Sequence, residues 1–242
     1  MGRLETWKRS HFEADGMGHD VYRTGHGPGV IVCHEMPGLT DAVIAFGEEV
    51  VAAGYTVVLP HLFGPVDVPF SQKENMKVLP RLCISREFTM LAAGQTAPVA
   101  TWLRALARTL HKELGGPGVG ALGMCFTGGF ALAMMVDAPV VAPVLAQPAT
   151  PFPIGARRSA DVGLSPADLA EVRRRAAAGC EVMGLRYTAD RAVGTRFATL
   201  ERELGGRFVK VEFEGPGHST LTEQRQQRGV DEVLAFFDRQ LR

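Results

Sequence analysis

The chain has 242 residues, enough for one large domain or two small ones with a sizeable hydrophobic core. Its 26 basic and 26 acidic residues balance to a formal net charge of zero, which indicates neither nucleic acid nor an anionic membrane as a partner. The first residues form no apolar signal region, and no uninterrupted apolar run is long enough to cross a bilayer. We therefore expect a cytoplasmic protein.

The first part of the chain predicts a hairpin followed by alternating strands and helices. Residues 11–23 alternate loosely around Asp15-Gly16-Met17-Gly18, a sequence typical of a β-turn. Either Thr40 or Asp41 can cap the helix that follows. The elements expected after the hairpin are a buried strand at 29–33, a helix at 42–53 and a buried strand at 55–59 closed by Pro60.

The segment 61–90 is predicted to be irregular. It contains Gly64 and three prolines, Pro65, Pro69 and Pro80, and its apolar residues show no clear period. A loop of this length in a compact domain more often has a function than not. We expect it to form a wall or a lid of a pocket.

The remainder of the chain alternates regularly between strands and helices. The expected helices are 96–114, a segment ending near 136, 165–178, 195–204 and 230–241. The expected strands are 119–122, 140–145, 181–186 and 208–213. Such alternation, with a period of roughly 30 residues, is typical of βαβ units. We therefore predict one α/β domain over 1–242, with a mostly parallel sheet, helices on both faces and an N-terminal β-hairpin.

A thiol lies at the apex of a strand–turn–helix pattern. The sequence Gly123-Met-Cys125-Phe-Thr-Gly-Gly129 follows a short apolar run and leads into an apolar helix-like segment. Small residues permit close crossing of strand and helix, as a nucleophile elbow requires. At a helix start, unpaired N–H groups would favour the Cys125 thiolate. The alternative is a buried free cysteine beside a tightly packed helix.

Three further acid–base candidates follow predicted strands. Glu35 comes after the strand at 29–33, Asp190 after that at 181–186, and His218 after that at 208–213. Ligands of open α/β sheets bind at the carboxyl ends of strands. The order nucleophile, acid, histidine is that of α/β-hydrolases. Taken singly, Asp190 could cap a helix, His218 could be a surface turn residue, and Glu35 could be a paired loop carboxylate.

Together these segments resemble the dienelactone hydrolase family of α/β-hydrolases, the carboxymethylenebutenolidases. The segments that carry the resemblance are Val30–Gly38, Gly123–Gly129, Thr188–Asp190 and Gly215–Ser219, and the likeness extends over about 29–241. It implies an α/β-hydrolase fold with Cys125 as nucleophile and Asp190 and His218 completing a triad. It also implies that Glu35 contacts the cysteine.

The resemblance implies cysteine-dependent hydrolysis of a small ester or lactone through a thioester. The oxyanion would then be held by the backbone N–H groups of Phe126 and Met36. A carboxylate beside a thiol disfavours the thiolate by like-charge repulsion. The family pattern accordingly suggests that Glu35 keeps the resting Cys125 protonated until substrate displaces it.

The sequence also departs from the family pattern. Members active on dienelactone bind its carboxylate with two arginines, one shortly after the histidine, where this chain has Thr222. Arg81 and Arg86 are weak candidates for the other substrate-binding arginine. His61 replaces an aspartate that the family commonly has after the second strand. These differences argue against a dienelactone-type substrate, but not against another small ester or lactone.

Two other functions remain open from the sequence. The same elbow could serve a thioesterase or an acyltransferase, and release of product into water would separate these from a hydrolase. A non-catalytic protein of this fold could instead bind a small ligand, and hydrolysis of an aryl ester that depends on Cys125 would exclude that. No glycine-rich phosphate loop follows the first strand, the cysteines lack CxxC spacing, and the histidines lack metal-ligand spacing. We therefore expect no cofactor and no metal.

Overall fold

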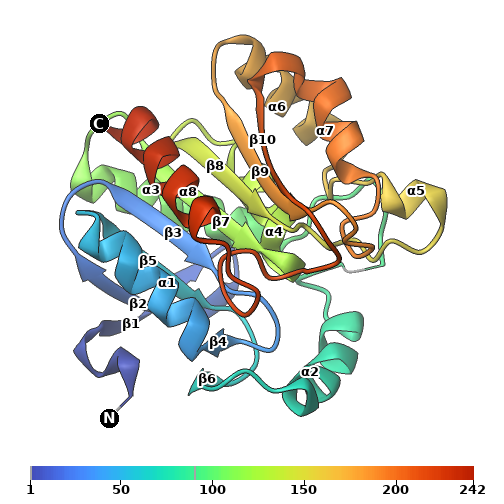
Figure 1. Cartoon of the computed structure of the whole chain (residues 1–242). Coiled ribbons are helices and arrows are strands. Elements are labelled where there is room, and N and C mark those ends of the chain that lie inside the picture. The colour runs from blue at the N-terminus through green and yellow to red at the C-terminus, as the bar shows by residue number, and fades with distance from the viewer. Residues whose placement is uncertain (1, 90) are drawn as a thin grey trace.

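The computed structural model describes residues 2–89 and 91–242, and within them the main sheet has eight strands in the order β1-β2-β5-β3-β7-β8-β9-β10 (Figure 1). Its strands are β1 Lys8–Ala14, β2 Met17–Gly25, β3 Gly29–Cys33, β5 Thr56–His61, β7 Val119–Met124, β8 Val140–Ala146, β9 Val182–Tyr187 and β10 Phe208–Phe213. A small parallel pair is formed by β4 Leu39–Thr40 and β6 Val66–Val68.

The main sheet is antiparallel at one side and parallel elsewhere. Strands β1 and β2 form a hairpin, and β2 pairs antiparallel with β5. From β5 through β3, β7, β8 and β9 to β10, every neighbouring pair is parallel. The carboxyl ends of the parallel strands therefore meet at one edge of the sheet, and the loops that follow them converge there.

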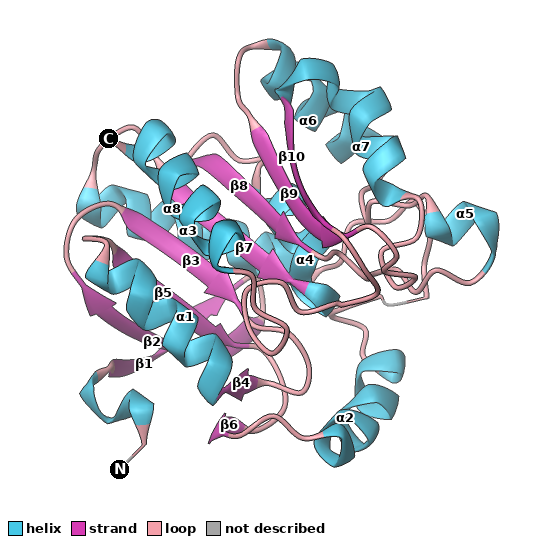
Figure 2. Ribbon diagram, in the orientation of Figure 1, coloured by secondary structure: helices cyan, strands magenta, loops and turns pink. Residues whose placement is uncertain are grey.

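Helices cover both faces of the sheet (Figure 2). They are α1 Asp41–Ala52, α2 Gln72–Ile84, α3 Val99–Leu114, α4 Gly128–Met134, α5 Gly155–Ser159, α6 Pro166–Ala177, α7 Arg196–Leu204 and α8 Gln227–Leu241, with 3₁₀ turns η1 Arg3–Thr6, η2 Cys125–Thr127 and η3 Gly205–Arg207. Helices α1 and α8 pack on one face, and α3, α4, α6 and α7 contribute to the core on the other.

The alternation of side chains along the strands produces these two cores. In β3, Val30 and Val32 point into the α1/α8 core, and Ile31 and Cys33 point into the opposite core. Successive side chains of a strand face opposite sides, so a strand buried on both faces has a continuous apolar sequence. Burial of this kind is the main stabilising contribution to the fold.

The structure confirms the predicted α/β architecture, with its mostly parallel sheet and N-terminal hairpin. Of the two cap candidates for α1, the Thr40 side chain accepts the hydrogen bond from the Val43 backbone N–H. Strand β5 does not end before Pro60 but runs through it to His61. Helix α8 starts at Gln227, three residues before the predicted start at Val230. The first turn of this helix is polar and lacks apolar spacing, so the sequence pattern did not indicate it.

The segment 61–90, expected to be irregular, contains β6 and the helix α2. Only Val78 and Leu82 of α2 are buried, which leaves too few apolar positions to produce a helical period in the sequence. Pro80 lies inside the helix, where proline is normally disfavoured because it lacks an N–H donor. The prediction of a loop, which rested partly on the prolines of this segment, was therefore wrong for α2.

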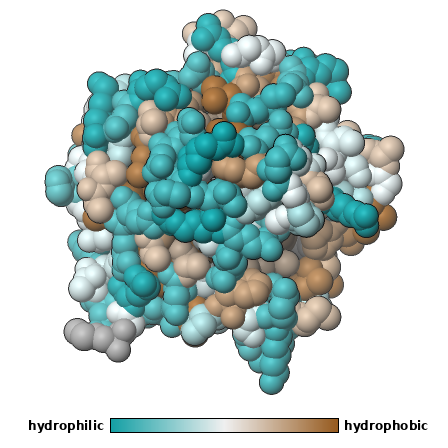
Figure 3. Space-filling model, viewed as in Figure 1, coloured by the Kyte–Doolittle hydropathy of each residue, from teal (hydrophilic) through white to brown (hydrophobic). Residues whose placement is uncertain are grey.

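The surface seen in Figure 3 is mostly hydrophilic, with smaller apolar areas between the polar side chains. This pattern agrees with the charged fraction of 21% and the mean hydropathy near zero. In the described part of the chain, no helix has both the length and the apolar character needed to span a bilayer.

Candidate active site

Cys125 occupies a strained elbow between β7 and α4. It follows Met124, the last residue of β7, and has a φ of +51°, a value that residues with a side chain rarely adopt. Backbone strain of this kind costs about 1–3 kcal/mol and clusters at functional sites. The strain fits a nucleophile elbow, in which the sharp turn exposes the reactive atom above the sheet.

The elbow depends on glycine where the backbone crosses itself. A Cβ on Gly123 would lie 2.1 Å from the carbonyl oxygen of Thr127, and one on Gly128 would lie 2.6 Å from the Cα of Pro148. Contacts this short with backbone atoms cannot be relieved by a side-chain rotation. The close crossing expected from the sequence is therefore present, and it leaves no room for larger residues.

His218 and Asp190 meet at the carboxyl edge of the sheet, on the loops that follow β10 and β9. The Nδ1 atom of His218 lies 2.7 Å from Oδ2 of Asp190, whose side chain is 5% exposed. The other carboxylate oxygen, Oδ1, accepts a hydrogen bond from the Ala192 backbone N–H at 2.9 Å. The aspartate thus fixes the imidazole and leaves Nε2 for a second partner.

Cys125 lines the same pocket as His218. Burial lowers the pKa of His218, but the charge of Cys125, the hydrogen bond to Asp190 and the hydrogen bond with Cys125 outweigh it and raise the pKa to about 11. His218 and Cys125 can therefore act as an acid–base partner and a nucleophile.

Glu35 lies two residues beyond β3 and is 3% exposed. Its oxygen Oε2 accepts hydrogen bonds from Oγ of Ser219 at 2.9 Å and from Nε2 of Gln147 at 3.4 Å, and Oε1 accepts one from the hydroxyl of Thr222. Gln147 is fixed in turn because its Oε1 accepts from the Thr220 hydroxyl at 2.7 Å. Glu35 is therefore bound to the loop that carries His218.

Burial raises the pKa of Glu35, and the hydrogen bonds from Thr222 and Ser219 partly oppose this rise. Thr222 stands where the family pattern has a substrate-binding arginine, and here its hydroxyl donates to Glu35 instead. A neutral donor in place of a cation leaves the buried carboxyl without an ion-pair partner among the residues that hydrogen-bond to it.

His34, the residue before Glu35, links the loop after β3 to the loop after β5. It is fully buried, and burial lowers its pKa to about 3, so that it is neutral. Its Nε2 accepts a hydrogen bond from the Leu62 backbone N–H at 3.1 Å, and its Nδ1 lies 3.0 Å from the Glu35 carbonyl oxygen. Nδ1 therefore carries the proton and donates. His61 lies nearby, with Nε2 at 2.9 Å from the Gly64 carbonyl oxygen.

The expected oxyanion donors flank the cysteine. Phe126 follows Cys125 directly, and Met36 lines the same pocket as Cys125. Among the hydrogen bonds of residues 2–89 and 91–242, none has the Met36 N–H as donor. The hydroxyl of Thr127 holds the two segments together, since it lies 3.1 Å from the carbonyl oxygens of both Cys33 and His34.

Three of the four catalytic candidates line one pocket of about 400 Å³. Cys125, His218 and Glu35 contribute reactive groups to it, and Phe70 and Phe152 contribute aromatic walls. The other lining residues are Met36, Gln72, Asn75, Ala149, Ala192, Ser219, Glu223 and Gln224. This size falls in the range of about 300–1,000 Å³ that is usual for small-molecule sites.

The structure does not bring the two candidate arginines to this pocket. Arg81 lies on α2, where it lines a different surface hollow with Glu74 and Lys77. Arg86 is exposed in the turn after α2. The same segment does supply Phe70, Gln72 and Asn75 to the pocket, so it contributes a wall as expected.

Several site residues were missed by the sequence reasoning. Gln147 directly follows β8 and is fully buried with a φ of +36°, and Ser219 and Thr222 follow His218. Gln147 had a usable signal, because a polar residue at the end of an apolar strand is placed at the functional edge of the sheet. Ser219 and Thr222 had none, since their role depends on contact with distant Glu35.

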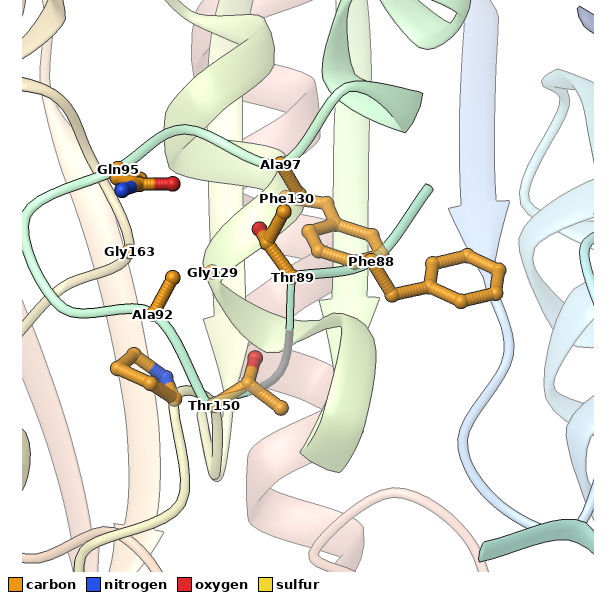
Figure 4. A pocket seen from close by; sticks show the side chains of 10 residues that line it. Phe88, Thr89, Ala92, Gln95, Ala97, Gly129, Phe130, Thr150 and Gly163 are labelled. Atoms are coloured by element: carbon orange, nitrogen blue, oxygen red, sulfur yellow. The ribbon is translucent and has the colours of Figure 1, made fainter. Parts of the chain in front are cut away.

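A further hollow is lined by a different set of residues (Figure 4). It measures about 20 Å³ and is lined by Phe88, Ala97, Gly129, Phe130 and Thr150 among others, none of which lines the Cys125 pocket. A volume of this size holds about one water molecule. It is therefore too small for an ester substrate. In the part of the chain that the structure describes, no group of three His, Cys, Asp or Glu side chains is arranged to hold a metal ion.

Comparison of the sequence with known protein families shows to which family the chain belongs. The family model described as "Dienelactone hydrolase family" matches residues 19–159, more than half of the chain. The chain belongs to the dienelactone hydrolase family. It is accordingly a hydrolase of the carboxylic ester and lactone class. No curated protein matches the sequence.

Solved structures of low sequence identity share the fold. A dienelactone hydrolase from Anabaena variabilis has a TM-score of 0.67 at 15% identity, covering 98% of this chain and 99% of its own. A putative dienelactone hydrolase from Klebsiella pneumoniae has a TM-score of 0.62 at 14% identity, covering 96% and 98%. A cold-adapted esterase from an Arctic intertidal metagenomic library has a TM-score of 0.61 at 15% identity, covering 98% and 94%. The predicted α/β-hydrolase fold is thereby confirmed.

Proposed function

We propose that the protein hydrolyses a small ester or lactone through a Cys125–His218–Asp190 triad and a thioester acyl-enzyme. One observation carries this proposal. Cys125, on its strained elbow, lines the same pocket as His218, whose Nδ1 lies 2.7 Å from the Asp190 carboxylate. A nucleophile, a base and an orienting acid in this relation are the parts needed for acyl transfer.

The reaction then has two halves. The Cys125 thiolate attacks the substrate carbonyl carbon, and the N–H groups of Phe126 and Met36 stabilise the oxyanion. As the oxyanion collapses, the C–O bond to the alcohol breaks and the leaving oxygen takes the proton from Nε2 of His218. A water molecule next gives its proton to His218 and attacks the thioester. Collapse releases the carboxylic acid and restores the thiolate.

Trapping of the acyl-enzyme tests this sequence of steps. Wild-type protein is mixed with p-nitrophenyl acetate, quenched in acid after short times and digested for mass spectrometry. We expect one acetyl group on the peptide that contains Cys125, because the thioester is stable in acid, and a burst of nitrophenolate of similar amount. Acetylation at a serine, or turnover with no acylated peptide, would contradict the proposal.

The same reaction mixture separates a hydrolase from an acyltransferase. The acetyl group is followed in the presence of an added thiol or amine. A hydrolase releases acetate into water at a rate that these acceptors change little. A transferase moves the acetyl group onto the acceptor and turns over faster as its concentration rises.

We propose that Glu35 restrains the resting nucleophile. Both groups line one pocket, and a neighbouring negative charge disfavours the thiolate. Glu35→Gln is expected to increase the rate of Cys125 alkylation by iodoacetamide roughly threefold to tenfold, the effect of up to about one pKa unit. The rate is measured from the alkylated Cys125 peptide. Glu232→Gln, at an exposed position on α8, is the control. An unchanged rate in Glu35→Gln would exclude this role.

We further propose that the enzyme acts in the cytoplasm on a freely diffusing substrate. Cys33, Cys83, Cys125 and Cys180 are free thiols, which suits a reducing compartment. The balanced net charge of the chain offers no general attraction to nucleic acid or to anionic lipid.

A further inference from the structure

The walls of the Cys125 pocket carry an uneven set of charges. Of the described residues that line it, none is lysine or arginine, whereas Glu35 and Glu223 are acidic. Its polar but uncharged members are Gln72, Asn75, Ser219 and Gln224. His218 is the only basic side chain in this set, and its Nδ1 already lies 2.7 Å from the Asp190 carboxylate.

One cation close to Glu223 in the sequence is engaged elsewhere. The guanidinium of Arg225, two residues beyond Glu223, is bound to the carboxylate of Glu49 by two contacts of 2.7 Å. Position 222 holds a threonine, whose hydroxyl donates to Glu35. A substrate carboxylate in this pocket would therefore lose hydration without gaining an ion-pair partner.

Glu223 adds a negative charge to a pocket that has no lysine or arginine among its described lining residues. It is an exposed residue that still lines the pocket, so its carboxylate lies where a substrate passes from solvent toward Cys125. Burial and the charge of Asp41 raise the pKa of Glu223.

The remaining surface favours uncharged groups. Phe70 and Phe152 offer aromatic faces, and Met36, Ala149 and Ala192 offer aliphatic contact. Such walls stabilise apolar substrate atoms by removing their surface from water. The amides of Gln72 and Asn75 can hydrogen-bond to an uncharged polar group.

From these observations, and resting on the proposed hydrolase function, we infer that the pocket takes small esters or lactones whose acyl part is uncharged and discriminates against those that carry a carboxylate. Glu223 is the residue that sets this discrimination. The relevant contribution is repulsion of the incoming anion, a form of specificity obtained by disfavouring the wrong ligand.

Three p-nitrophenyl esters of matched length test the inference at pH 8 and low salt. They are the hexanoate, the monoester of adipic acid and its uncharged amide, the adipamate. For wild type we expect kcat/KM to be at least about tenfold higher for the adipamate than for the adipate, since the two differ mainly in charge. Values within about twofold of each other would overturn the inference.

Variants of Glu223 then test whether this residue causes the discrimination against carboxylates. Glu223→Lys is expected to reduce the adipamate-to-adipate ratio at least fivefold, and Glu223→Gln is expected to reduce it less. Glu232→Lys makes the same change in net charge at an exposed position that does not line the pocket, and it should leave the ratio unchanged. Equal ratios in Glu223→Lys and Glu232→Lys would contradict the role of Glu223.

Cys125→Ala, assayed with the hexanoate in parallel, keeps this inference separate from the proposed function. Wild-type rates in that variant would overturn the cysteine mechanism whatever the charge preference. Loss of hexanoate hydrolysis in that variant, together with an equal wild-type preference for adipate and adipamate, would overturn the charge preference alone.

Discussion

Replacement of Cys125 by alanine is expected to lower kcat/KM for p-nitrophenyl acetate by at least about 10³-fold. The variant keeps the elbow, the pocket and the oxyanion donors but has no atom that can form the acyl-enzyme. Alanine also adds no bulk at a position where φ is +51°, so the fold should persist. The measurement is steady-state hydrolysis, with circular dichroism and thermal unfolding to check the fold.

Cys83→Ala is the matched control for this experiment. Cys83 is another half-buried free thiol, but it lies on α2 and does not line the pocket. Its loss should change kcat/KM by less than about twofold. Iodoacetamide should inactivate wild type and Cys83→Ala in parallel with alkylation of the Cys125 peptide. Turnover of Cys125→Ala at more than a few per cent of the wild-type rate would exclude the cysteine mechanism.

The features that the sequence predicted are those set by local pattern. The apolar runs of β3, β5 and β7 specify buried strands, and their alternation with helices predicts a mostly parallel sheet. Glu35, Cys125, Asp190 and His218 could be proposed because each follows such a strand. Carboxyl ends of parallel strands meet at one edge, so neighbours in space could be inferred from residues far apart in sequence.

The features that the sequence could not predict depend on long-range contacts. Helix α2 has few buried residues and an internal proline, so neither propensity nor periodicity indicates it. The hydrogen bonds from Ser219 and Thr222 to Glu35 join residues more than 180 positions apart, and no local signal specifies them. The candidate arginines Arg81 and Arg86 were chosen from a segment whose path was unknown. In the structure, this segment instead contributes the ring of Phe70 and the amides of Gln72 and Asn75 to the pocket.

A buried arginine supports the loops around the site, and its removal should have a large effect on stability. Arg196, at the start of α7, is fully buried, and burial lowers its pKa to about 10. Its guanidinium donates to the carbonyl oxygens of Val193 at 2.8 Å and of Ala192 and Arg158 at 3.1 Å, and it also donates to that of Pro151. It thereby joins the loops that carry Phe152 and Ala192, which both line the pocket.

Arg196→Met is expected to lower the free energy of unfolding by about 2–4 kcal/mol. Methionine fills a similar volume but leaves these carbonyl groups buried without a donor, at about 1–3 kcal/mol each, while relief from burying a charge offsets part of the loss. For a chain of this size the melting temperature should fall by roughly 5–15 °C. Differential scanning calorimetry or urea unfolding measures the change.

Arg202→Met is the matched control, because Arg202 lies on the same helix but is exposed, where its ion pair with Glu203 contributes little. We expect its melting temperature to stay within about 2 °C of wild type. The loosened loops of Arg196→Met should also raise KM for p-nitrophenyl acetate more than they lower kcat at a temperature where the variant is folded, because Phe152 and Ala192 line the pocket and carry none of the proposed reacting groups. Equal stability of Arg196→Met and Arg202→Met would show that the buried guanidinium does not hold these loops.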